Sequence, residues 1–263
     1  MLEDSAAPEI SSETDSLQAS VAVSDEELLA GMSAMDDKDG DVTESLVVAS
    51  KSKFIKKGTL RVNYAAFDSS NNVGTYTREL TYTDYQSPRF SISQPLRYLS
   101  GVTNVNYLSN VRATDCIDNN ISSQIMYTLG EKQMTSDVAS VQPLNLQVTN
   151  SAGDTAVIEM EIRYDDYVTY YTQSPHLSNY VMYLKVGDTP DYRSLLDGVW
   201  AGNVTRPFAD TNFDPLSDVE IDDSGADLGT PGAYTVVYRL SRLDRDNNRE
   251  ALGTAELLVI VEG

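Results

Sequence analysis

One short acidic segment occurs twice in this chain. Residues 34–43 read AMDDKDGDVT, and residues 113–122 read ATDCIDNNIS. A segment that alternates apolar and polar residues follows each copy, which is typical of a half-buried β-strand. Because internal repetition means that one structural unit is used more than once, this repeat constrains the fold more than any single motif does. It predicts a chain built from a small β module in tandem.

The alternating segment can be traced three times. Its apolar positions are Leu60, Val62, Tyr64 and Ala66, then Leu144, Leu146 and Val148, then Tyr234, Val236, Tyr238 and Leu240. Turns rich in Asp, Asn, Ser and Gly follow the first two copies, at residues 68–72 and 150–154. Closing strands are expected at residues 76–83, 157–164 and 254–261. One of the expected elements is a helix, from Ser24 to Ala34, with Ser24 as N-cap and Glu27 completing a capping box. A distorted strand pair is the alternative there.

Each unit opens with a proline and a short apolar strand. Pro8, Pro88 and Pro175 lie 80 and 87 residues apart, close to the roughly 100 residues of a β-sandwich domain. We therefore expect an all-β chain with three domains: residues 1–86 with an N-terminal linker, residues 87–172, and a divergent third at 173–263 with a longer central insertion. Residues 1–16 are expected to be linker or a loosely held first strand.

These motifs resemble bacterial immunoglobulin-like domains that occur as repeated arrays on surface and secreted proteins, a module type also noted in a pesticidal crystal protein. The match in the first unit runs over Ala34, Asp36, Asp39, Gly40, Asp41, Val42 and Thr43, then Gly58, Leu60, Val62, Tyr64, Asp68 and Asn72. In the second it covers Ala113, Asp115, Asp118, Asn120, Ile121, Ser122, Asn150 and Gly153. The third keeps residues 231–238 and 257–261 and lacks the acidic segment. The resemblance implies three tandem immunoglobulin-like β-sandwiches on a bacterial cell surface or in a secreted protein.

Composition limits the partners. Forty acidic against nineteen basic residues give a net charge of −21. This charge disfavours binding to nucleic acid and to anionic membrane surfaces, because both are negatively charged. The single cysteine, Cys116, excludes an intramolecular disulfide. No apolar run approaches the roughly 20 residues that span a bilayer, so no membrane insertion is expected. Residues 1–30 show no signal peptide pattern, so the signal and anchor of an exported parent are expected to be absent from this chain.

Calcium is the cofactor that the acidic repeat suggests, because hard cations bind several carboxylate oxygens. The candidate metal ligands are Asp36, Asp37, Asp39, Asp41, Asp115 and Asp118. The spacing differs from that of an EF-hand, in which glycine stands sixth and glutamate twelfth. The alternative is that these residues build exposed turns and cap their own backbone.

No catalytic constellation is expected, since one histidine, His176, and one cysteine in a different module make no dyad or multi-histidine metal site. Trp200, the single tryptophan, is a candidate for binding a glycan or a protein partner, and the alternative is that it plugs the end of a sandwich. Lys51, Lys53 and Asn63 are weaker candidates for a covalent Lys–Asn cross-link.

The sequence therefore predicts a non-catalytic extracellular module, either a spacer or stalk, or an adhesion array for a host protein, a neighbouring surface protein or a glycan. Two alternatives stay open: accessory modules of a secreted carbohydrate-active enzyme, and a phage or pilus structural subunit.

Overall fold

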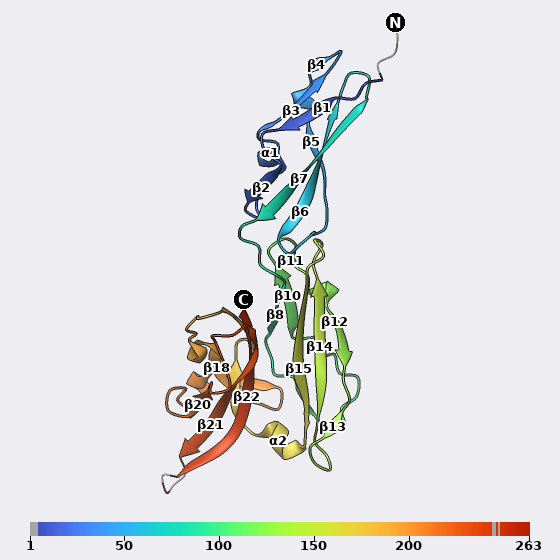
Figure 1. Cartoon of the computed structure of the whole chain (residues 1–263). Coiled ribbons are helices and arrows are strands. Elements are labelled where there is room, and N and C mark those ends of the chain that lie inside the picture. The colour runs from blue at the N-terminus through green and yellow to red at the C-terminus, as the bar shows by residue number, and fades with distance from the viewer. Residues whose placement is uncertain (1–4, 244–245, 247) are drawn as a thin grey trace. The chain divides into compact units, whose positions relative to one another are not determined.

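The structure is a computed structural model that describes residues 5–243, 246 and 248–263 (Figure 1). These residues form three immunoglobulin-like β-sandwiches one after another along the chain. Each sandwich contains a three-stranded sheet and a sheet built on a path of four strands. The repeated architecture confirms the all-β prediction of three tandem sandwiches.

The first sandwich pairs the order β1-β3-β4 with the order β2-β7-β6-β5. Its small sheet consists of β1 (Glu9–Ser12), β3 (Met32–Asp36) and β4 (Gly40–Asp41). Its larger sheet consists of β2 (Ser16–Ala19), β7 (Val73–Tyr82), β6 (Thr59–Phe67) and β5 (Val47–Lys51). The helix α1 (Asp25–Leu28) and a 3-10 turn at Thr43–Ser45 connect strands.

The second and third sandwiches repeat this plan. The small sheet of the second consists of β8 (Arg89–Ile92), β10 (Val111–Asp115) and β11 (Asn119–Asn120). Its larger sheet consists of β12 (Met126–Leu129), β14 (Ser140–Thr149), β15 (Thr155–Asp165) and β9 (Arg97–Leu99), and the short β13 (Gln133–Met134) also pairs with β14. A 3-10 turn lies at Ser122–Gln124. Helix α2 (Tyr167–Tyr171) follows. The third contains β16 (Ser174–Leu177), β18 (Leu196–Ala201) and β19 (Val204–Arg206), facing β17 (Val181–Lys185), β22 (Arg249–Glu262), β21 (Gly232–Leu243) and β20 (Val219–Asp222), with 3-10 turns at Tyr192–Leu195 and Phe208–Asp210.

In every sandwich the entering chain switches from one sheet to the other. Its first strand pairs antiparallel in the small sheet, as β1 does with β3. Its next strand pairs in parallel with the last strand of the same sandwich: β2 with β7, β9 with β15, and β17 with β22. The entering segment of each sandwich thus supplies one edge strand to each of its two sheets.

The alternating apolar residues fill the interiors as predicted. Val62, Tyr64, Leu144 and Leu146 are fully buried, and Tyr238 occupies the corresponding interior of the third sandwich. Each of the two tyrosines also donates a hydrogen bond to a backbone carbonyl. The Tyr64 hydroxyl donates to the Leu28 carbonyl at 3.0 Å, and the Tyr238 hydroxyl donates to the Tyr192 carbonyl at 2.7 Å. The three interiors therefore follow directly from the period of two in the sequence.

The predicted helix over residues 24–34 is wrong in length. Its capping box forms, with Ser24 and Glu27 bonded reciprocally, but α1 ends at Leu28. Gly31 then takes a positive φ of 70°, and Met32 and Ala34 enter β3 as buried strand residues. Residues 1–16, expected to be linker or a loosely held first strand, contain the strand β1 and the first residue of β2, while residues 1–4 lie outside the described part of the chain.

By its contacts the chain divides into two compact units. One contains Met1–Pro88 with Asp115–Asn119 and Thr149–Ala156, which are loop and strand-end residues of the second sandwich. The other contains Arg89–Thr114, Asn120–Val148 and Val157–Gly263. The boundaries predicted at residues 86 and 172 remain predictions, because this division does not follow single sandwiches.

Candidate functional sites

The first acidic segment forms the tight turn between β3 and β4. The carboxylate of Asp36, at the end of β3, accepts backbone hydrogen bonds from Lys38 and Asp39 on Oδ1, both at 2.9 Å. Asp39 reaches across to the loop after β6, where its two oxygens accept bonds from the backbone N–H and the hydroxyl of Ser69. These bonds lower the pKa of Asp39 because they stabilise its charged form.

The facing loop, residues 68–72, is organised by Asp68. This side chain is 6% exposed, and its Oδ1 accepts from the backbone N–H groups of Ser70 and Asn72. Its Oδ2 accepts from the Asn72 amide at 2.7 Å. Asn71 in the same loop has a positive φ of 63°, which asparagine tolerates better than most residues.

The second acidic segment has the same geometry with one exchange. Asp115 accepts from the backbone of Ile117 and Asp118, and Asp118 accepts from the backbone and hydroxyl of Ser151. Asn150 stands where Asp68 stands in the first copy. Its amide nitrogen donates to Asp115 Oδ2 at 2.6 Å and to the Tyr85 hydroxyl at 2.9 Å.

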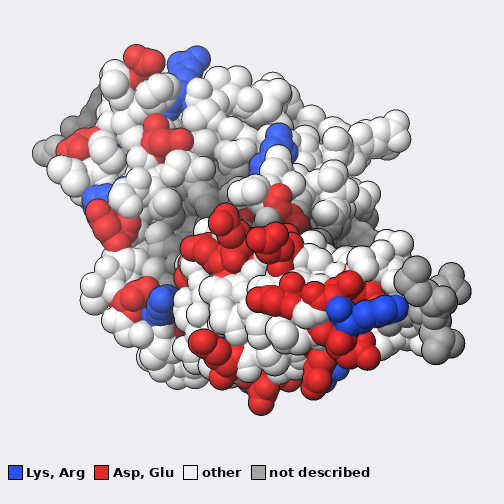
Figure 2. Space-filling view, turned by 90° about the horizontal axis from the view of Figure 1, so that it is seen from above, with Lys and Arg blue, Asp and Glu red and all other residues white. Residues whose placement is uncertain are grey.

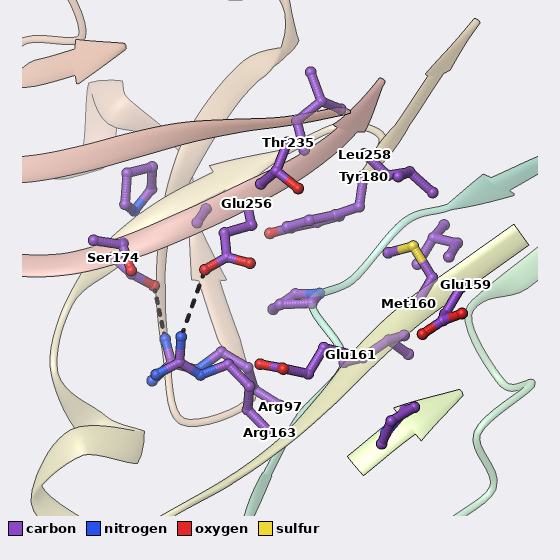
Figure 3. A pocket seen from close by; sticks show the side chains of 18 residues that line it. Arg97, Glu159, Met160, Glu161, Arg163, Ser174, Tyr180, Thr235, Glu256 and Leu258 are labelled. Atoms are coloured by element: carbon purple, nitrogen blue, oxygen red, sulfur yellow. Dashed lines mark hydrogen bonds and ion pairs between the residues drawn. The ribbon is translucent and has the colours of Figure 1, made fainter. Parts of the chain in front are cut away.

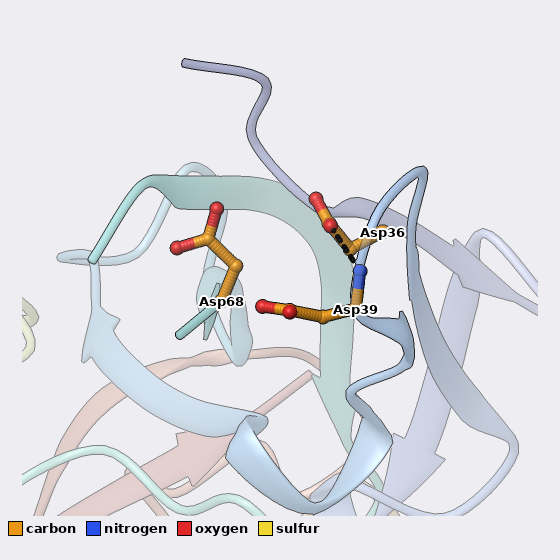
Figure 4. A group of neighbouring side chains, drawn as sticks. All are labelled: Asp36, Asp39 and Asp68. Atoms are coloured by element: carbon orange, nitrogen blue, oxygen red, sulfur yellow. Dashed lines mark hydrogen bonds between the residues drawn. The ribbon is translucent and has the colours of Figure 1, made fainter. Parts of the chain in front are cut away.

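The structure thus separates the six predicted metal ligands. Asp36 and Asp39 converge with Asp68, with one oxygen of each lying within 4.8 Å of the others (Figure 4). Asp37 and Asp41 are exposed and stand outside this group. Asp41 accepts from the Thr43 hydroxyl and backbone, which lower its pKa. Among the described residues, Asp115 and Asp118 belong to no such group of three.

Asp68 was not predicted as a ligand. The sequence placed it in a turn, and the signal that could have found it is the aspartate–asparagine difference between the two repeats at residues 68 and 150. Calcium binding at the two acidic segments stays a prediction. The bonds within both turns fit the alternative in which the aspartates cap their own backbone.

Trp200 lies in β18 and is 2% exposed, which contradicts the exposed ring that stacking on a sugar would need. Its ring meets Tyr170 edge-on, with centroids 5.3 Å apart. The Arg97 guanidinium lies over the Trp200 ring, 4.9 Å from its centroid. Trp200, Tyr170 and Arg97 thus form one cluster. This packing matches the alternative in which Trp200 plugs the end of a sandwich, since an indole ring that is buried against Tyr170 and Arg97 has no face free for a ligand.

Arg97 joins that aromatic cluster to an ion pair. Its side chain is 10% exposed and lies 2.7 Å from Asp165 Oδ2, itself on a side chain that is 5% exposed. It also donates to the Thr169 carbonyl at 3.1 Å and to the Ser174 hydroxyl at 3.5 Å. The second and third sandwiches are therefore linked through one buried cation.

A cavity of about 330 Å³ lies beside this cation, within the compact unit that contains both sandwiches (Figure 3). Arg163, Glu161, Glu256 and Tyr180 line it. Figure 3 shows Arg163 paired with Glu256, at a distance of 3.7 Å. Burial and the nearby Glu256 raise the pKa of Glu161. The volume lies at the low end of the range for small-molecule sites.

The groups considered for covalent chemistry have other partners. His176 is buried in the edge strand β16 and its Nδ1 lies 2.5 Å from Asp197, while Cys116 is exposed and bonds the Gln86 backbone. Lys51 pairs with Asp25 at 2.9 Å. Asn63 bonds the hydroxyls of Ser50 and Thr77. Nothing in these contacts brings a lysine and an asparagine together.

Acidic side chains outnumber basic ones by 40 to 19. On the face shown in Figure 2, Asp and Glu gather in patches among uncharged residues, and Lys and Arg are fewer. No helix among the described residues is long and apolar enough to cross a membrane.

No family model matches the sequence, and no curated protein matches it. Among solved structures, the chain is similar to CBM51-2 in complex with GlcNAc and INT domains from Clostridium perfringens ZmpB (16% identity, 60% of this chain, 41% of that chain, TM-score 0.24). It is also similar to the M60 catalytic domain with CBM51-1 and CBM51-2 of the same protein (14%, 97%, 30%, 0.22) and to human CDH23 EC21-23 (15%, 97%, 100%, 0.23). The chain spans less than half the length of the first two. TM-scores this low establish no shared function, and the fold class rests on the sheets themselves.

Proposed function

We propose that the chain is a non-catalytic spacer in an extracellular bacterial surface protein. The observation that supports this best is the buried Arg97 cluster, which holds the second and third sandwiches through an ion pair, a backbone hydrogen bond and an aromatic contact. A spacer needs such a junction because free hinges between domains would leave the separation of its ends undefined.

A second set of contacts within the other compact unit supports the same role. The Phe54 backbone N–H donates to the Ala152 carbonyl at 2.8 Å, and the Tyr85 and Ser87 hydroxyls both donate to Asp154. The Tyr85 ring packs edge-on against Phe54 at 4.7 Å. These hydrogen bonds join the segments around Phe54 and Tyr85 to the loop at residues 150–154, and they oppose free motion between those segments.

Small-angle X-ray scattering tests the proposal. The expected result is a normalised Kratky curve that returns to the baseline, as a rigid folded particle gives, and that stays unchanged between low and high protein concentration. A variant with a flexible Gly-Ser insertion after Thr172 serves as the control, and its Kratky curve should stay raised at higher angles. A curve as raised in the unaltered chain as in this control would contradict the spacer role.

Adhesion is the second candidate, favoured by the cavity beside Arg163. Its mixture of an aromatic ring, two arginines and three glutamates suits a polar ligand such as a glycan. Binding of the purified chain to immobilised bacterial and host polysaccharides would support adhesion if Arg163→Ala removed it. Binding that survived Arg163→Ala would assign the ligand to another surface.

A further inference from the structure

One carboxylate oxygen in the first acidic turn is buried and unpaired. Asp36 is 6% exposed, and its Oδ1 receives both backbone bonds of the turn. Its Oδ2 is inaccessible to solvent and accepts no hydrogen bond from any residue in the described part of the chain. A buried charge without a partner is costly, so native proteins almost always supply it with a donor or a cation.

The second repeat shows how the same oxygen is satisfied elsewhere in this chain. There the equivalent oxygen, Asp115 Oδ2, receives a 2.6 Å bond from the Asn150 amide. Asp68 occupies the position of Asn150 and, when ionised, has no hydrogen to donate. The exchange therefore replaces the donor of the second repeat with a second negative charge, on a side chain that lies in one group with Asp36.

A third carboxylate completes the group. Figure 4 shows Asp36 and Asp39 on the turn and Asp68 on the facing loop. One oxygen of each lies within 4.8 Å of the other two, which is about the largest separation that two oxygens 2.4 Å from one calcium ion can have. Three like charges this close repel one another unless a positive charge lies among them.

We propose that Asp36, Asp39 and Asp68 bind one calcium ion, and that the second repeat does not because Asn150 already satisfies Asp115. The ion would cross-link the β3–β4 turn to the loop after β6, with water completing its shell of six to eight oxygens. The inference does not depend on the spacer role.

Isothermal titration of metal-stripped protein with calcium chloride tests the site. The expected result is one ion per chain, with a dissociation constant on the order of 10⁻⁴ to 10⁻³ M, as in other extracellular modules. Asp68→Asn should weaken binding at least about tenfold, since it removes a ligand charge and places a donor against Asp36. Asp37→Asn is the matched control: it removes the same charge from an exposed position in the same turn and should change binding less than about twofold.

Two further variants keep the test decisive if Asp68→Asn folds poorly. Asp68→Asn combined with Asn72→Asp copies the Asn150–Asp154 pair of the second repeat and should fold without calcium. Asn150→Asp removes the donor to Asp115 and should raise the stoichiometry from one ion to two. Metal-free melting should place the double variant above the unaltered protein, because its Asp36 has a partner.

Three results would overturn the proposal. They are no calcium binding by the unaltered protein, equal affinity in Asp68→Asn, and equal loss in Asp37→Asn.

Discussion

Arg97 is a single residue on which one junction of the chain depends. Its charge is desolvated together with that of Asp165, at side-chain exposures of 10% and 5%. A second arginine, Arg163, lies 3.8 Å from the same carboxylate and is itself more exposed. Asp165 would therefore keep only a distant partner if Arg97 were lost, and an unpaired buried charge costs more than a surface ion pair contributes.

We expect Arg97→Ala to lower the free energy of unfolding by about 3 kcal/mol, because it strands Asp165 and removes the cation from the Trp200 ring. Arg242→Ala breaks the exposed pair with Glu250, whose side chains are 54% and 51% exposed, and should cost less than about 1 kcal/mol. Urea denaturation followed by tryptophan fluorescence measures both. Equal losses in the two variants would show that Arg97 is not a buried partner in solution.

Among the strands, β18 depends on a position without a side chain. A Cβ on Gly198 would lie 2.3 Å from the carbonyl oxygen of Arg206 in β19, the neighbouring strand. Gly198→Ala should therefore force the two strands apart and destabilise the third sandwich by about 1–3 kcal/mol.

Gly225→Ala is the comparison for that substitution, since its Cβ would meet only the Thr235 carbonyl at an ordinary 3.6 Å. It should leave the urea midpoint nearly unchanged. If Gly198→Ala were equally silent, the close approach of β18 and β19 would not be a feature of the folded protein.

The alternation of apolar and polar residues was enough to place the central strands, because apolar residues such as Val62 and Leu146 lie on one face of the strand and their polar neighbours lie on the other. The alternation did not predict where α1 ends, because a capping box marks only the start of a helix and Gly31 takes a positive φ soon after Leu28. It also did not show that Trp200 is buried. Burial depends on partners distant in sequence, such as Arg97 and Tyr170. Asp68 was missed for the same reason: its significance lies in what it faces.

At the scale of the whole molecule, aspartates that accept hydrogen bonds at turns and caps tie stability to pH. The pKa values of Asp39, Asp41, Asp84, Asp166 and Asp222 all lie below the ordinary 3.8, chiefly because neighbouring hydroxyl and backbone N–H groups donate to them. Their stabilising contribution is complete above the unfolded value and is lost as the pH falls through the lower folded values.

We therefore expect the urea midpoint to be level between pH 7 and about 5 and to fall below about pH 4. Salt at about 0.3 M limits the separate effect of net charge by screening it. Asp166→Asn, which keeps an acceptor at the N-cap of α2 but cannot be protonated, should lose less between pH 6 and 3. A midpoint that rose on acidification would contradict this assignment.

The parallel pairing of β2 with β7, repeated as β9 with β15 and β17 with β22, has a mechanical consequence. The entering and leaving strands of each sandwich lie side by side and run in the same direction, so a tensile force on the two ends pulls them lengthwise past each other. Their hydrogen bonds are then loaded in shear and must yield together, where a hairpin pulled open at one end would yield one bond at a time. Such a clamp in every sandwich makes the chain suited to bearing load.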